Sequence, residues 1–236
     1  MLSFKINEKR YHSPNWEGVT LLKFLNFLDD VQPLQPECLD GFLFFEEGEE
    51  VDLQKRWDEF PVNNKIEALE YFAIEIAYWC DAPKELIINS ISPDMAFNGW
   101  LSLQVQYNPN LFKVDEDFKS FKFKGTTYVL PEKHLRGTTI GEYADAANFQ
   151  TVAEQLKNGR WKSIADVIAV ICRPKGEEYN FEVTHENRSK LFLNLPMDIV
   201  INVAFFLLMQ NVTSTDTIAI YSLLQAKGRL KHKLTV

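Results

Sequence analysis

Two stretches of the chain follow the same pattern of aromatic, basic and turn residues, and this repetition most constrains the fold. Residues 4–24 read FKINEKRYHSPNWEGVTLLKF, and residues 121–143 read FKFKGTTYVLPEKHLRGTTIGEY. Each stretch begins with Phe-Lys, places a Tyr seven positions after the Phe, and places a Pro three positions after the Tyr. The alternation of apolar and polar residues around a short turn predicts a β-hairpin in each. We interpret the two stretches as one unit written twice.

The remainder of each half has helical periodicity with similar punctuation. In both halves a long apolar-periodic segment runs into a Cys and then a Pro, and a Pro-initiated helix follows. Thr20 and Thr139 each precede a helix as predicted N-caps. The predicted helices that follow cover residues 63–79, 84–89, 92–104, 139–149, 160–171 and 195–210. The sequence therefore predicts an α+β fold, mostly helical, built from an internally duplicated unit of a β-hairpin plus three helices.

This pattern also predicts the domain organisation. We assign residues 1–110 to the first repeat, 111–212 to the second repeat, and 213–236 to a C-terminal segment with a basic tail.

Within the first repeat, Met95 falls on the predicted core face of its helix. Glu75 lies on the long helix among aromatic residues, a position compatible with burial, and we expect it to pair with a basic side chain or to reach the helix rim.

Composition excludes several classes of function. The chain has 236 residues, 46% of them apolar, and a net charge of −8. This is enough apolar material for a substantial core, and the acidic balance argues against extensive contact with nucleic acid. The longest apolar run, residues 199–209, is too short to span a bilayer, and the start of the chain lacks a signal-peptide pattern, so we expect no membrane contact and a reducing, cytosolic location.

The residues with potential chemistry form no recognisable catalytic or metal-binding motif. There is no GxxxxGK[ST] phosphate loop and no GxSxG nucleophile elbow, and the four histidines stand alone. Cys38, Cys80 and Cys172 lack the spacing of a zinc site or a disulfide framework, and we expect Cys80 and Cys172 to be buried free thiols. We therefore predict no catalytic residue, no cofactor and no metal, and a protein that is not an enzyme.

Two other segments are candidates for binding a partner. An apolar run at 42–45 directly precedes an acidic run at 46–50, and the last ten residues carry four positive charges and no acid. The first segment suits either a buried turn beside a solvated acidic loop or an apolar docking segment with a charged rim. The second suits either a solvated terminus or an arm that docks on an acidic neighbour. The candidate partner-binding residues are Phe42, Phe44, Phe45, Glu46, Glu47, Lys227, Arg229, Lys231 and Lys233.

The repeated motifs carry a resemblance. The stretches FKINEKRY, FKFKGTTYVLP with TTIGEY, WKSIADVIAVICRPKG and LPMDIVINVAFFLLM together resemble a family of tailed-bacteriophage proteins that are encoded among the virion and tail-assembly genes. In that family a helix running into Arg-Pro is typical, here Arg173-Pro174. The first half has Asp81-Ala82-Pro83 at the corresponding place and departs from the pattern.

The resemblance implies a non-enzymatic role in phage assembly. One implied role is a ring or connector component of the virion near the portal and tail, with other virion or tail proteins as partners and a homo-oligomeric ring as its assembly. The other is a tail-assembly chaperone that is absent from the mature particle. Both imply the host cytoplasm during assembly, and the first implies the virion as well. A small-molecule or host-protein binding module, or an enzyme with a site between the repeats, is the competing class.

Overall fold

A computed structural model describes residues 1–43, 52–132, 138–142, 144–146, 148, 159–183 and 187–210. The chain divides into two compact units. Unit 1 contains Met1–Asn15 and Asn26–Leu111, and unit 2 contains Trp16–Leu25 and the described residues from Phe112 onward. The fold is α+β and mostly helical with small antiparallel sheets, as predicted.

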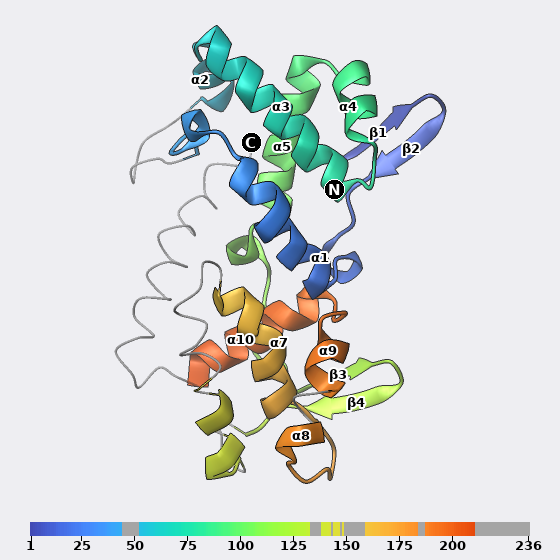
Figure 1. Cartoon of the computed structure of the whole chain (residues 1–236), viewed down its shortest axis with the longest axis vertical. Coiled ribbons are helices and arrows are strands. Elements are labelled where there is room, and N and C mark those ends of the chain that lie inside the picture. The colour runs from blue at the N-terminus through green and yellow to red at the C-terminus, as the bar shows by residue number, and fades with distance from the viewer. Residues whose placement is uncertain are drawn as a thin grey trace. The chain divides into compact units, whose positions relative to one another are not determined.

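Unit 1 is a helical body with one β-hairpin (Figure 1). The hairpin consists of two short antiparallel strands, and the chain then passes through a π-turn and short 3₁₀ turns into the main helices. The elements are β1 (Ser3–Ile6), β2 (Lys9–His12), η2 (Phe27–Val31), η3 (Gln32–Leu34), η4 (Glu37–Leu39), α2 (Leu53–Asp58), α3 (Val62–Trp79), α4 (Lys84–Ser90), α5 (Pro93–Gln106) and η5 (Pro109–Leu111).

The core of unit 1 is aromatic and lies mainly between α2, α3 and α5. The rings of Trp57 and Phe97 stack with centroids 4.7 Å apart, and those of Phe72 and Trp100 stack at 4.4 Å. Ser92 caps α5 because its Oγ accepts from the Met95 N–H at 3.3 Å, as its sequence position predicts. The Met95 side chain itself is exposed, so its predicted place on the core face was wrong.

Unit 2 combines a three-stranded sheet with helices whose core is mostly aliphatic. Residues 140–142, 144–146 and 148 are also helical. The named elements are η1 (Trp16–Gly18), α1 (Leu21–Asn26, its last residue in unit 1), β3 (Ser120–Phe123), β4 (Thr126–Val129), α7 (Gly159–Ile171), β5 (Arg173–Pro174), α8 (Phe181–Val183), α9 (Ser189–Phe192) and α10 (Met197–Gln210).

Residues 16–25 fold with unit 2, although the sequence pattern places them in the first repeat. The N–H of Leu21 donates to the carbonyl of Leu195 at 2.8 Å, and the N–H of Met197 donates to the carbonyl of Val19 at 2.8 Å. The Phe24 ring meets the Trp161 ring edge-on, with centroids 5.1 Å apart. Backbone hydrogen bonds and ring packing to distant residues therefore decide where this segment belongs.

The two hairpins are alike in local detail. Phe4 pairs with Tyr11 and Phe121 pairs with Tyr128, and each pair of rings is stacked, with centroids 5.7 Å and 5.3 Å apart. Both turns have positive φ at both central residues, which are Asn7-Glu8 and Lys124-Gly125. This is the backbone of a type I′ turn, one of the two common two-residue hairpin turns. Both turns lie where the sequence predicts them, while the larger prediction of an internal duplication stays a prediction.

Candidate functional site

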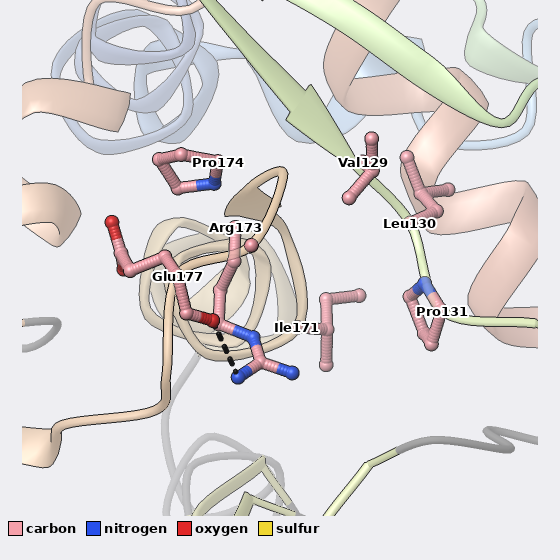
Figure 2. Close-up of a pocket in the computed structure, with 8 residues that line it drawn as sticks. Val129, Leu130, Pro131, Ile171, Arg173, Pro174 and Glu177 are labelled. Atoms are coloured by element: carbon pink, nitrogen blue, oxygen red, sulfur yellow. Dashed lines mark hydrogen bonds between the residues drawn. The ribbon is translucent and has the colours of Figure 1, made fainter.

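The candidate site lies in unit 2, where the end of α7 meets the end of β4. β5 pairs antiparallel with β4, so that Val129 lies opposite Arg173 and Tyr128 opposite Pro174. A pocket of about 110 Å³ lies at this junction. Figure 2 shows its lining side chains, and its lining residues are Val129, Leu130, Pro131, Ile171, Arg173, Pro174, Gly176 and Glu177.

Local sequence explains why the chain turns here. A residue before proline avoids the helical region, so Arg173 leaves α7 in an extended conformation and joins the sheet as β5. The N–H of Glu177 then donates to the carbonyl of Pro174 at 3.1 Å, which closes a four-residue turn. Gly176 has φ +85° within this turn, a backbone conformation that glycine adopts without steric cost.

Arg173 holds two separate segments at the site. Its Nη2 lies 2.8 Å from Oε1 of Glu142. Its Nη1 donates to the carbonyl of Glu177 at 3.2 Å (Figure 2). The Glu142 side chain is 1% exposed and that of Arg173 is 21% exposed. The ion pair is therefore largely withdrawn from water, where removal of one partner is costly.

Glu142 also closes the start of its own helix. Its N–H donates to Oγ1 of Thr139 at 3.2 Å, and its carboxylate accepts from the Thr139 N–H. This reciprocal pair is a capping box, and it confirms the predicted N-cap at Thr139. The same carboxylate thus caps the start of one helix and binds the guanidinium of Arg173.

A second arginine extends the network into the interior. Arg188 is 7% exposed, donates to the Glu177 carboxylate, and donates from Nη1 to the Ala169 carbonyl at 3.3 Å. The Cys172 thiol is fully buried nearby, and burial raises its pKa well above the usual range while the charge of Arg188 opposes that rise. The thiol is therefore protonated near neutral pH and unsuited to act as a nucleophile. Cys80 is also a buried free cysteine, as expected for both.

Tyr179 and Asp145 add a neighbouring polar contact. The Tyr179 hydroxyl donates to the Asp145 carboxylate. Burial first, and then this hydrogen bond, raise the pKa of Tyr179 above its usual value. The phenol therefore stays protonated and acts as a donor.

This arrangement is suited to holding segments together. Each of the two glutamates faces a guanidinium, and the pocket volume corresponds to a few water molecules, below the 300 Å³ or so at which small-molecule sites begin. Among the described residues, no group of three or more His, Cys, Asp or Glu is placed to hold a metal ion. The chemistry available is a matched set of charges that fixes a loop, a strand and two helices.

Of the nine predicted partner-binding residues, the structure describes only Phe42. It is 2% exposed and packs edge-on against the rings of Phe60 and Phe97, with centroids 5.3 Å and 6.0 Å away. The burial of Phe42 agrees with the first alternative for residues 42–45, a buried turn, and not with an exposed docking segment. The other eight lie outside the described residues: Phe44, Phe45, Glu46, Glu47, Lys227, Arg229, Lys231 and Lys233.

Glu75 is a second buried acidic group and lies in unit 1. The expectation that it pairs with a base or reaches the helix rim was wrong. Glu75 is 2% exposed and accepts from Nε1 of Trp100 at 3.1 Å and from Nε2 of Gln104 at 2.9 Å. Among the described residues it pairs with no base, and it does not reach the helix rim, because these neutral donors of α5 contact it. Burial raises its pKa to about 7, although hydrogen bonds from Tyr71, Gln104 and Trp100 oppose the rise.

The sequence held partial signals for the network in unit 2. Glu142 follows Thr139 at capping-box spacing, and Arg173-Pro174 stands out as helix punctuation. No local pattern predicted that Arg173 would reach Glu142, or that Arg188 would reach Glu177.

No family model, curated protein or solved structure matches this chain. Within the described part of the chain, no helix combines the length and the hydropathy needed to cross a bilayer.

Proposed function

We propose that this protein is a non-enzymatic structural component of a larger assembly, a ring or connector protein of a tailed-phage virion near the portal and tail. One observation carries the proposal. Most of the segments on which the resemblance rests lie in unit 2: β3–β4, the Thr139–Glu142 cap, Arg173-Pro174, and residues 195–197 with Val19. The FKINEKRY stretch forms the β1–β2 hairpin of unit 1. The motifs of unit 2 are thereby accounted for as parts of one scaffold.

The electrostatics of the scaffold support this role. Arg173 pairs with Glu142 and Arg188 pairs with Glu177, so the charges of the network are used in contacts within the protein. A ring or connector protein has to keep its shape in contact with its neighbours, and removing one partner of a buried charge pair would leave the other charge uncompensated.

Mass spectrometry of purified virions of the phage that encodes this chain tests the proposal. A ring or connector component is expected in the particle at a fixed, multiple copy number relative to the portal. Absence from purified virions, together with capture of a tail protein from infected lysate, would replace the proposal with the tail-assembly chaperone.

Variants connect this test to the site. We expect Arg173→Ala to lower incorporation into particles, because the loop and strand that Arg173 holds are released from Glu142. Lys55→Ala is the matched control, since Lys55 forms a solvent-exposed pair with Glu59 at 3.9 Å in unit 1. Equal incorporation of both variants would mean that assembly does not depend on the charge network.

A further inference from the structure

The β1–β2 hairpin carries closely spaced positive charges on its outer face. Lys5 and Arg10 are direct cross-strand partners, and both are exposed. Lys9, next to the turn, lies on the opposite face with Ile6 and Tyr11, and its Nζ is 4.8 Å from the centre of the Tyr11 ring. Glu8 is the one acid between Ser3 and His12, so the hairpin is basic on a chain with net charge −8.

The pairing of Lys5 with Arg10 is unfavourable in the isolated chain. Like charges directly opposite each other on one face of an antiparallel pair destabilise the sheet. Among the described residues, no carboxylate forms an ion pair with Lys5, Lys9 or Arg10. The repulsion is thus not relieved within the described part of the chain.

The β3–β4 hairpin shows that the fold does not require this charge pair. It has the same stacked Phe-Tyr pair and the same kind of turn, but Lys122, the counterpart of Lys5, lies opposite Thr127. A neutral partner is therefore compatible with a hairpin of this design. The second cation on β1–β2 needs a reason outside the hairpin itself.

The hairpin is held rigidly at its base. Ser13 Oγ accepts from the Leu2 N–H at 3.0 Å and donates to Oε1 of Gln106 at 2.9 Å, and the Tyr107 hydroxyl donates to the Pro14 carbonyl at 2.6 Å. The turn itself extends beyond the helices of unit 1 (Figure 1). A protruding element with a fixed base loses little freedom on binding.

We propose that the outer face of the β1–β2 hairpin binds an acidic surface on a second copy of this chain. Carboxylates placed between Lys5 and Arg10 would relieve their repulsion and form charge-assisted hydrogen bonds. Among the described residues, the run Asp115-Glu116-Asp117 of unit 2 offers three consecutive exposed acids. The carboxylate of Asp115 already accepts from the Asp117 N–H at 3.0 Å, which leaves Glu116 and Asp117 as the contact residues.

This contact deepens the proposed ring or connector role and rests on it. A hairpin of one copy on a different surface of the next is a heterologous interface, which closes into a ring when the rotation permits. Nucleic acid phosphates would also suit Lys5 and Arg10. The net charge of −8 disfavours that partner, because an acidic body repels the phosphate backbone.

The test is light scattering after size exclusion, with native mass spectrometry, on the full chain at about 0.05 M and about 0.5 M salt. We expect wild type to self-associate, and less so at high salt. Lys5→Glu turns the like-charge pair into an opposite-charge pair, so the hairpin is not weakened, yet self-association should fall by about tenfold. Lys122→Glu is the matched control on β3–β4 and should leave self-association unchanged.

A charge exchange tests the acidic counterpart. Lys5→Glu/Arg10→Glu and Glu116→Lys/Asp117→Lys should each weaken self-association, and the chain that carries all four changes should regain it. Failure of the fourfold variant to recover would overturn the assignment of Glu116 and Asp117.

Three results would overturn the proposal as a whole. They are a wild-type chain that stays monomeric, self-association that Lys5→Glu leaves unchanged, and retention of a labelled DNA duplex that Lys5→Glu abolishes while the protein remains monomeric. Each can occur with the protein present in purified virions. Failure of this contact is therefore distinguishable from failure of the proposed function.

Discussion

Both units bury a glutamate, and they stabilise it in different ways. In unit 1, Glu75 lies in an aromatic core and is bound by the indole of Trp100 and the amide of Gln104, both neutral donors. In unit 2, Glu142 faces the guanidinium of Arg173 and also closes a capping box with Thr139. Burial away from any cation favours the protonated carboxyl of Glu75 and outweighs its hydrogen bonds, whereas Glu142 is joined to a cation from another segment. Similar buried acids therefore give one unit a sensitivity to pH and the other a cross-link.

The largest effect is expected in the aromatic core of unit 1. Phe42→Ala removes a ring that packs against Phe60 and Phe97, and should lower the free energy of unfolding by about 4 kcal/mol. Urea denaturation followed by tryptophan fluorescence measures it, since Trp57 and Trp100 lie in the same cluster. Phe181→Ala on α8, where the side chain is 45% exposed, is the control and should cost about 1 kcal/mol or less. A similarly small cost at Phe42 would return that residue to the surface candidates.

The next effect is a dependence on pH that belongs to unit 1. The folded-state pKa of Glu75 is raised from 4.5 to about 7, so the folded chain keeps a proton that the unfolded chain releases. The free energy of unfolding should therefore fall as the pH rises from 4.5 to 7, by about 3 kcal/mol in all, and then level off. Denaturation at several pH values, compared between wild type and Glu75→Gln, isolates this contribution because other titrating groups cancel. Parallel pH profiles of the two proteins would contradict the prediction.

The cross-link in unit 2 should show a smaller effect. Arg173→Ala leaves the buried Glu142 carboxylate without its cation, and because Arg173 is partly exposed we expect a loss of about 2 kcal/mol. Glu142→Gln keeps the capping contacts and removes the charge. In a double-mutant cycle the two changes should show a coupling of about 1 kcal/mol. Additive effects would mean that the pair in unit 2 does not act as a cross-link.

The smallest effect tests where one segment belongs. Thr20 Oγ1 accepts from the Lys23 N–H at 3.2 Å and caps α1, so Thr20→Ala should cost about 1 kcal/mol. Hydrogen exchange should show faster exchange in α7 and α10 of unit 2, although Thr20 lies early in the chain. Ser92→Ala, which removes the cap of α5, should act on unit 1 instead. Faster exchange confined to α3 and α5 after Thr20→Ala would contradict the division into units.

Local features of the fold were predictable because their causes are local. Backbone sterics and residue alternation place both turns, at Asn7-Glu8 and Lys124-Gly125. Periodicity and caps predict helices at 63–79, 92–104, 160–171 and 195–210, and α3, α5, α7 and α10 occupy nearly the same residues. The candidate site was predictable only in fragments, as a Thr–Glu capping spacing and an Arg-Pro pair.

The sequence by itself determined which segments become hairpins and helices, since neighbours within a few residues decide those states. Only the tertiary structure decided which segments meet. It placed residues 16–25 in unit 2 and paired β5 with β4. It also brought Arg173 into contact with Glu142, and Glu75 into contact with Trp100 and Gln104. Periodicity states which face of a helix is apolar, but it does not state what covers that face. Those partners follow from the fit of whole surfaces, which no short stretch of sequence contains.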